Sequence, residues 1–531
     1  MRITWVQPED LVGHELRQAR EEGKDVAAIE ERWLASGGRP APPRGASQEP
    51  PPAEVARLAL ELLDELDALP RPLAEDEPDE LQAILEACDP VPGRAPDRDR
   101  IHGAWLGRAA GCVLGKPVEN IPREGIRALA QSTGNWPVAG WFTAVGLDPA
   151  VSERFPWNRA SRGTSLAESI DGIPEDDDLN FTMLGVVLLE RAGTAFGVED
   201  VAKLWLDYLP PGRIFTAERV AMRNLLEGVV PPSTATRRNP FREWIGARLR
   251  VDAYGWAAGG DPRRAAELAW ADARLSHRAN GVYAAMFMAA AHAASLWARS
   301  PGECADAGAS VVPRGSRLAE ALRFARGLDG DWESRVDAIY ERYGRYHWVH
   351  AINNTALVAA ALHSFDDFSS AICGVVQGGL DTDTNGAAVG SILGALRPID
   401  ERWSAPLRGR FASSLPGFDG ITLDELYARY DDYHWVHAIN NTALVAAALY
   451  AFDEDFSGAI SAVVQGGWDT DTNGAAVGSI VGAAVGLAGI EERWSAPLGG
   501  RFTSSLPGFD GITLHELVRR TIAVAGAPAT A

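Results

Sequence analysis

A near-identical internal repeat constrains this sequence more than any other feature. The segment YHWVHAINNTALVAAAL occupies residues 346–362 and recurs without a change at residues 433–449. The segment DTDTNGAAVGSI occupies residues 381–392 and recurs at residues 469–480. A repeat solenoid needs about three or more units to bury a continuous core, so two copies do not make one. We therefore interpret the C-terminal third as a tandem duplication of the end of a domain.

The rest of the chain predicts an all-α protein with a helical N-terminal extension. The two repeat units fall near residues 339–425 and 426–516. Residues 1–97 have helical patterns broken by a Pro-rich linker at residues 40–54. The apolar residues of the segment from 98 to 531 are mostly Ala and Leu, spaced i, i+3, i+4, as on the buried face of a helix. We expect a compact multi-helix domain there, with the duplicated segment inside it.

Charge and cysteine usage exclude several classes of protein. The 531 residues include 50 Lys and Arg against 72 Asp and Glu, a formal net charge of −22. A nucleic-acid-binding protein needs positive charge on its contact face, so none is expected as a partner. The four cysteines form no C-x-x-C pair, which favours a reducing, cytoplasmic location. No apolar segment predicts a secretory signal or a membrane span.

One acidic cluster precedes an apolar helical run in the segment PEDDDLNF, residues 174–181. A single Asp there would cap the helix and favour its positive end. Three adjacent carboxylates repel one another, however, and each would rather be protonated unless a cation lies among them. Asp176, Asp177 and Asp178 are therefore candidate metal ligands, with acidic helix capping as the alternative.

A second acidic motif, Gly-Gly-x-Asp-Thr-Asp-Thr-Asn-Gly, occurs once in each repeat copy. Its candidate ligands are Asp381, Asp383 and Thr384 in the first copy and Asp469, Asp471 and Thr472 in the second. The alternative is an Asp- or Thr-capped helix after a turn. Because both acidic motifs lie at predicted helix starts, they can converge on one site. Ligands that are all oxygen favour Mg²⁺, Mn²⁺ or Ca²⁺ over zinc or copper.

Glycines at every fourth position predict, for each of two helices, a close approach to some neighbouring helix. They are Gly103, Gly107, Gly111 and Gly115 in one segment, and Gly386, Gly390 and Gly394 in another, with Gly474, Gly478 and Gly482 in the second copy. A phosphate-binding loop is the alternative for the first segment, but the pattern G-x-x-x-x-G-K-[ST] is absent because Pro117 follows Lys116. We expect helix packing.

Four of these segments together resemble the ADP-ribosylglycohydrolase family. They are GAWLGRAAGCVLGKPVE, EDDDLNF, the Ser-His of LSHRANG, and GGxDTDTNGA, in that order, and the resemblance covers roughly residues 98–516. It implies an all-α domain with two Mg²⁺ ions (or Mn²⁺) in a central cleft. It also implies cleavage of the glycosidic bond between ADP-ribose and an acceptor such as an arginine or serine side chain.

The resemblance also implies roles for single residues. Asp176, Asp177 and Asp178 would bind metal together with one Asp-x-Asp-Thr motif, and Leu179 stands where the family usually has Thr. Glu119 would lie near the metals as a catalytic residue, and Asp178 would act as a base or stabilise the positively charged transition state. The expected substrate-binding residues are His277, beside the substrate's phosphates, and Asn280, Gly379 and Gly467. For His277, which precedes an apolar helix, a structural cap or core residue is the alternative.

One cleft accepts only one of the two Asp-x-Asp-Thr motifs. The first copy follows the rest of the domain directly. The second copy is followed by a longer helix, GAAVGLAGIEERW against GALRPIDERW, which slightly favours Asp469, Asp471 and Thr472. The surplus copy would either pack beside the domain or leave apolar helices exposed.

Three other functions fit parts of the pattern. An isoprenoid-diphosphate synthase is another all-α Mg²⁺ enzyme, acting on a diphosphate, but EDDDLNF lacks the D-D-x-x-D spacing. An aspartyl phosphotransferase would need an apolar strand ending at the Asp, and the paired glycines break such a strand. A catalytically impaired ADP-ribose-binding protein stays open because of Leu179 and the duplication.

Overall fold

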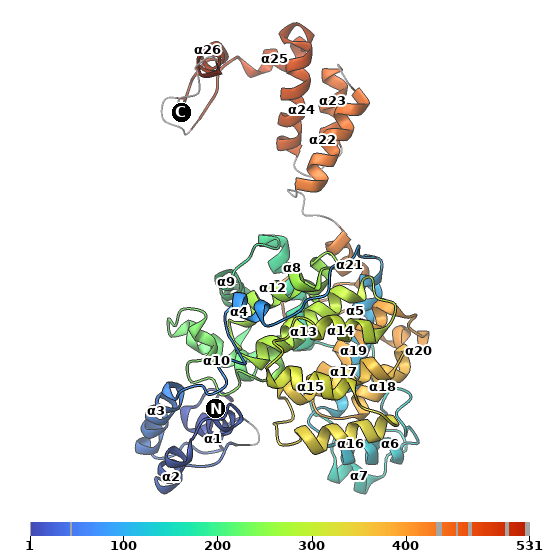
Figure 1. The fold of residues 1–531 in the computed structure, drawn as a ribbon. Coiled ribbons are helices and arrows are strands. Elements are labelled where there is room, and N and C mark those ends of the chain that lie inside the picture. Colours follow the sequence, from blue (N-terminus) through green and yellow to red (C-terminus); the bar gives the residue numbers. More distant parts are fainter. Residues whose placement is uncertain are drawn as a thin grey trace. The chain divides into compact units, whose positions relative to one another are not determined.

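The computed structural model describes residues 2–42, 45–431, 438–452, 455–465, 470–504 and 509–525. Over these ranges the chain forms helices joined by loops, with isolated β-bridges and no named strand, so the all-α fold is confirmed (Figure 1). None of the helices in these ranges is both long and apolar enough to cross a membrane. The chain divides into two compact units, Met1–Tyr430 and Asp431–Ala531.

Most of the helices belong to the first unit. They are α1 (Pro8–Glu21), α2 (Ala27–Ala35), α3 (Ala53–Ala68), α4 (Leu81–Glu86), α5 (Arg100–Gly115), α6 (Arg123–Ser132), α7 (Pro149–Arg154), α8 (Asp177–Ala192), α9 (Val198–Tyr208), α10 (Thr216–Leu226), α11 (Asp252–Ala257), α12 (Pro262–Ala273), α13 (Asn280–Ser295), α14 (Pro301–Ala309), α15 (Arg317–Arg326), α16 (Trp332–Tyr343), α17 (Ala351–Ser364), α18 (Phe368–Gln377), α19 (Thr382–Leu396), α20 (Glu401–Ser404) and α21 (Leu423–Asp431). The short 3₁₀ helices are η1 (Lys116–Val118), η2 (Pro211–Arg213), η3 (Ser233–Ala235), η4 (Ile245–Arg250) and η5 (Ala405–Leu407).

Helices α5 and α19 both carry the glycine spacing that predicts close helix packing, and the structure shows that they pack against each other. A Cβ on Gly107 would lie 2.1 Å from the carbonyl oxygen of Gly390, and a Cβ on Gly390 would lie 2.1 Å from that of Gly107. The same contact repeats at Gly103–Gly394 and at Gly111–Gly386. We call these three pairs the glycine ladder. It brings the end of α5 beside the start of α19, where the Thr382 hydroxyl donates to the Gly115 carbonyl (2.8 Å).

The N-terminal extension packs on the rest of the first unit. Helices α1 to α3 bury Leu11, Leu16 and Leu62 in a core that they share with later parts of the first unit. The residues that those later parts contribute are Ala217, Val220, Phe241, Trp244, Ile245 and Val349. A buried arginine, Arg242, forms ion pairs of 2.7 Å with two glutamates. Glu15 lies within α1, and Glu22 is the residue that caps the C-terminal end of α1. Because these charges are buried together, removal of one would leave the others unpaired.

The second unit contains the described part of the second repeat copy. Its helices are α22 (Ala438–Phe452), α23 (Phe456–Gln465), α24 (Thr470–Val485), η6 (Leu487–Gly489), α25 (Glu492–Ser495), η7 (Ala496–Leu498) and α26 (Leu514–Ala525). A small core forms around Phe456, Val463 and Val477. Helix α24 repeats the sequence of α19, but a Cβ on Gly478 would meet no atom closer than 3.4 Å. The glycine ladder is therefore a property of the first copy.

The second unit also exposes apolar side chains that the first unit buries. Val464 and Ile480 are 43% and 52% exposed, whereas their counterparts Val376 and Ile392 are fully buried. The residue types are the same in both copies, so the difference follows from neighbours: in the first copy, α18 and α19 both pack against α5. Taken by itself, the second unit therefore leaves these apolar side chains uncovered by its own helices.

Candidate metal centre

A cavity of about 420 Å³ in the first unit is lined by carboxylates from three helix ends. Asp176, which caps α8, and Asp178 in its first turn lie on one side. Asp381 and Asp383 come from the start of α19, and Glu119 follows η1 at the end of α5. The glycine ladder therefore positions two of the three groups, since it fixes where α19 begins relative to α5.

The carboxylates form two groups that share one residue. Oxygens of Asp176, Asp178 and Asp383 lie within 4.8 Å of one another, and so do oxygens of Glu119, Asp381 and Asp383. The side chain of Thr384 donates to Asp178 (3.0 Å), which ties the two acidic motifs together directly. Asp177 also lines the cavity. The two motifs singled out in the sequence thus converge on one site.

Burial and mutual repulsion make these carboxylates hard to ionise together. Burial and the charge of Asp383 raise the pKa of Asp381 well above its usual value. Burial and the charge of Asp176 do the same to the pKa of Asp178, and they raise the pKa of Asp383 to about 6. Such crowding is unfavourable unless positive charge is added among the oxygens.

Two buried basic residues that the sequence analysis did not select support the cluster. Lys116 pairs with Asp176 and donates to the carbonyl of Glu175 (3.1 Å). Burial alone would raise the pKa of Asp176, but the Lys116 ammonium beside it brings that pKa below its usual value. Arg108 contacts Asp178 (3.4 Å). The sequence analysis interpreted the glycine-rich segment that contains Lys116 only as a closely packed helix. The position of Lys116 directly after the last glycine of that helix was the signal that could have identified it.

Of the expected substrate-binding residues, the three that the structure describes lie outside the lining of this cavity. His277 is buried and shares a hydrogen bond with the hydroxyl of Ser276 (2.8 Å). Its side chain lies 3.9 Å from that of Glu218. Glu218 lines the cavity, whereas His277 does not. Asn280 donates from its buried side chain to Glu77 and so anchors the start of α13. Gly379 adopts a φ of +81° just before Leu380 and Asp381. Gly467 lies outside the described residues.

The carboxylates beside Asp176 and Asp178 belong to the first repeat copy. In the second copy, Asp469 lies outside the described residues, while Asp471 and Thr472 are exposed in the second unit. This corrects the preference for the second copy that helix length gave. Helix length carried no information on this point, because the decisive contact is the glycine ladder with α5, which the first copy makes.

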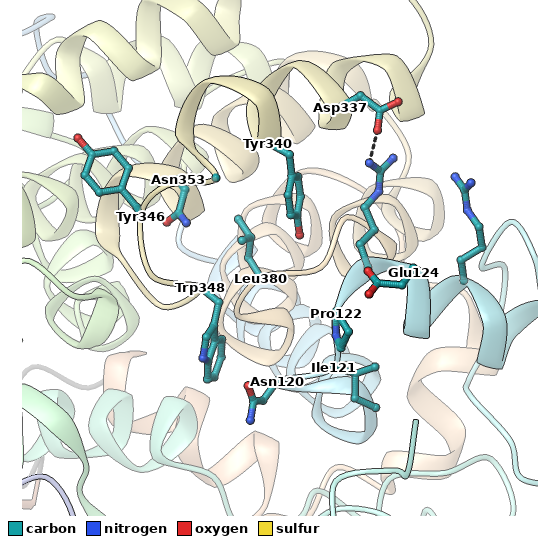
Figure 2. Close-up of a pocket in the computed structure, with 13 residues that line it drawn as sticks. Asn120, Ile121, Pro122, Glu124, Asp337, Tyr340, Tyr346, Trp348, Asn353 and Leu380 are labelled. Carbon is teal, nitrogen blue, oxygen red and sulfur yellow. Dashed lines mark hydrogen bonds and ion pairs between the residues drawn. The ribbon is translucent and has the colours of Figure 1, made fainter. Parts of the chain in front are cut away.

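Figure 2 shows a second hollow, of about 640 Å³. Trp348 lines both hollows. In Figure 2 it lies near Asn120, the residue after Glu119, and Leu380 lies beside them. On the other side, Asn158 of the long loop before α8 donates to Glu119 (2.8 Å) and lines the first cavity. Glu119 thus lies where the two hollows approach each other.

Most of the sequence, from residue 94 onward, matches a known family. The sequence model of the family described as ADP-ribosylglycohydrolase matches residues 94–432, and it matches again over residues 418–528. The chain belongs to the ADP-ribosylglycohydrolase family. The first match contains every carboxylate of the cavity, and the second falls on the part of the chain that holds the second repeat copy. The extension before residue 94 lies outside both matches.

Two similar proteins give the extent of the likeness. An uncharacterised protein of Archaeoglobus fulgidus (strain ATCC 49558) is 26% identical over 322 residues, which are 59% of this chain and 92% of that protein. A solved chain from an ADP-ribosylglycohydrolase-related protein complex is 22% identical, with a TM-score of 0.37. The match covers 63% of the present ADP-ribosylglycohydrolase family chain and 96% of the solved chain.

Proposed function

We propose that this chain hydrolyses the glycosidic bond between ADP-ribose and an acceptor, such as an arginine or serine side chain, with the help of Mg²⁺. Membership of the ADP-ribosylglycohydrolase family supports the class of substrate. The observation that carries the proposal is the convergence of Asp176 and Asp178 with Asp381 and Asp383 around one cavity. Neither motif alone distinguishes a helix cap from a cation site.

The residues of the cavity fit one or two hard divalent cations. The donors are all oxygen atoms, which suits Mg²⁺ or Mn²⁺. Asp176, Asp178 and Asp383 would hold one ion, while Glu119, Asp381 and Asp383 would hold a second. Bound there, such ions would supply Lewis acidity toward the hydroxyls of the substrate's ribose and toward water.

Two carboxylates of the protein, Asp178 and Glu119, have different expected roles in the reaction. Asp178 is held by Thr384 and by Arg108, so its carboxylate has a fixed direction. Cleavage of a glycosidic bond passes through an oxocarbenium-like state, and a fixed carboxylate stabilises that positive charge. Glu119 is only partly buried, and burial together with the charge of Asp383 raises its pKa well above its usual value. Without a cation it therefore holds a proton at the edge of the cavity, and it would give up that proton on binding a second ion.

Release of ADP-ribose from two ADP-ribosyl peptides, one linked through arginine and one through serine, tests the proposal. We expect release from one of them in the presence of Mg²⁺ and its loss on addition of EDTA. Asp178→Asn with unchanged release would remove Asp178 from the mechanism. Release that is unaffected by EDTA would contradict the cation-dependent site, and no release or binding with either peptide would contradict the proposed substrate class.

A catalytically impaired ADP-ribose-binding protein is the second candidate. Leu179, which stands where the family usually has Thr, is fully buried in the core and contributes no oxygen to the cavity. The site therefore lacks one polar group that the resemblance implies. Tight binding of ADP-ribose without release from either peptide would identify this function.

A further inference from the structure

The N-terminal extension contributes a residue to the carboxylate cavity. Trp5, which precedes α1 (Figure 1), is partly buried and lines the same cavity as Asp176 and Asp383. The aromatic part of the lining consists of Trp5, Phe181, Phe215, Trp244, His347 and Trp348. The cavity therefore has carboxylates in one part of its wall and flat aromatic surfaces in another.

The backbone on both sides of Trp5 is fixed by hydrogen bonds. The Trp5 amide donates to the Gly45 carbonyl (2.6 Å). On α10, Arg219 donates to the carbonyl of Thr4 (3.3 Å) and Arg223 donates to the carbonyl of Val6 (3.3 Å). These bonds hold Trp5 at a φ of +65°, a region that bulky residues seldom adopt. An outlier of this kind persists only where its surroundings hold it, and such outliers cluster at functional sites.

The indole of Trp5 is fixed as well. Its ring centre lies 5.5 Å from that of Phe241 in an edge-to-face contact and 6.1 Å from that of Trp244. The backbone of Gly45 lies against the ring, since a Cβ on Gly45 would be 2.4 Å from an indole carbon. Trp5 thus offers a preorganised surface to the cavity rather than a freely rotating side chain.

We propose that Trp5 determines substrate specificity by stacking against the adenine base of an ADP-ribosyl substrate. This inference rests on the proposed function. An ADP-ribosyl conjugate combines sugar hydroxyls and phosphates, which suit a cation-filled carboxylate cluster, with one flat base, which suits an aromatic wall. The two kinds of wall in this cavity match the two ends of that ligand. Trp5 lies outside the family match, so the extension would complete the substrate site.

The first experiment compares two ligands on two variants by calorimetry in Mg²⁺. ADP-ribose contains the base, and ribose 5-phosphate does not. We expect Trp5→Ala to weaken binding of ADP-ribose by roughly 5- to 100-fold, the change that corresponds to loss of one stacked base. Binding of ribose 5-phosphate should stay the same, and Trp5→Phe should retain most of the affinity for ADP-ribose. On an ADP-ribosyl peptide, KM should rise with kcat unchanged, as for an interaction made equally in ground and transition states.

A second pair of variants moves Trp5 without removing it. Gly45→Ala places a methyl group against the indole and should weaken ADP-ribose binding selectively. Gly37→Ala is the matched control, since Gly37 has a similar φ of +79° and a Cβ there would meet nothing within 4 Å. It should leave the binding of both ligands as in the wild type. Any loss of affinity for both ligands alike in Gly45→Ala would indicate disruption of the fold.

The outcomes separate the inference from the function on which it rests. If the wild type binds or hydrolyses ADP-ribosyl compounds but Trp5→Ala binds ADP-ribose normally, or loses both ligands equally, the role of Trp5 is wrong while the proposed function stands. If the wild type neither binds ADP-ribose nor releases it from peptides, the proposed function fails, and the role of Trp5 fails with it.

Discussion

At the scale of single residues, Asp383 is the position on which the candidate metal centre depends. It is the one residue that belongs to both carboxylate groups, and burial with the charge of Asp176 raises its pKa to about 6. The repeat supplies a natural comparison, because Asp471 has the same sequence neighbours in the second unit and is exposed. The two positions separate the effect of sequence from the effect of surroundings.

Asp383→Asn should have opposite effects on the metal-free and the Mg²⁺-bound protein. Removing one charge from a crowded cluster relieves repulsion, so the variant should melt higher than the wild type in EDTA at neutral pH. It should also lose most of the gain in Tm that Mg²⁺ gives the wild type, with Mg²⁺ affinity lower by roughly 100-fold or more. Thermal melts with EDTA or Mg²⁺ measure both effects. Asp471→Asn is the control and should resemble the wild type; a full Mg²⁺ response in Asp383→Asn would contradict the site.

Glu21, at the end of α1, should make stability depend on pH. Burial and the charge of Glu243 raise its pKa from 4.5 to about 7. Because the folded state holds this proton more tightly than the unfolded state, its contribution to stability is present below pH 4.5 and is lost as the pH rises to about 7. Glu21→Gln should therefore gain stability over the wild type across that window, by at most about 3 kcal/mol.

Urea unfolding at a series of pH values measures the effect of Glu21→Gln. The difference in unfolding free energy from the wild type should be smallest in acid and constant above about pH 7. Glu31→Gln changes an exposed glutamate of α2 and serves as the control. A difference for Glu21→Gln that does not vary with pH would show that its carboxyl group is not the cause.

At the scale of elements, the packing of α5 on α19 connects the fold to the site. Both helices place glycine at every fourth position, and each glycine approaches a carbonyl oxygen of the other helix. Close packing of backbones gains van der Waals contact and Cα–H···O contacts over the whole interface. It also places Asp381 and Asp383 beside the end of α5. A substitution in the glycine ladder should therefore also change the positions of the carboxylates in the cavity.

Gly390→Ala should destabilise the first unit, because its methyl group would lie 2.1 Å from a backbone carbonyl. We expect a loss of roughly 1–3 kcal/mol or more, with weaker Mg²⁺ binding as the helices move apart. Gly478→Ala is the same substitution in the same sequence context, where the nearest atom is 3.4 Å away. It should be neutral or slightly stabilising, since alanine favours a helix over glycine. Denaturant unfolding compares them, and equal losses would contradict the ladder.

Local patterns in the sequence predicted much of this element and its site. Spacing alone indicated the helices and their glycine faces, and adjacent carboxylates indicated the cation site. Beyond the convergence of the two acidic motifs, contacts between distant segments were not predictable from a single sequence. Lys116 supports Asp176 from 60 residues away, and Trp5 reaches the cavity from the other end of the chain. The role expected for His277 stays a prediction; its side chain is buried 3.9 Å from Glu218, a residue that lines the cavity.

At the scale of the whole molecule, the two units that contain the repeat copies are of unequal completeness. The first unit contains the carboxylate cavity, the glycine ladder and the packed extension. The second unit repeats the sequence of the helices α17 to α19 but retains a small core, with Val464 and Ile480 exposed. The two units should therefore differ in stability, and only the first should respond to the cation.

A chain that ends at Tyr430 tests this division. It should fold, keep the Mg²⁺-dependent gain in Tm, and release ADP-ribose as the full chain does, because every residue of the cavity precedes Tyr430. It should also be less prone to associate, since it lacks the exposed apolar residues of the second unit. Calorimetry should show a second, Mg²⁺-independent transition in the full chain alone. Loss of Mg²⁺ stabilisation on truncation would contradict the assignment of the site to the first copy.

The glycine ladder also has a periodicity of its own. Because its glycines recur every four residues, sliding α19 along α5 by about 6 Å would place glycines opposite glycines again. The ladder by itself therefore permits more than one register between the two helices. The polar end of the interface removes this freedom, because the hydroxyl of Thr382 meets the carbonyl of Gly115 and Thr384 meets Asp178 in one alignment only. The residues that form the candidate metal centre are thus also those that select one register for the central helix pair.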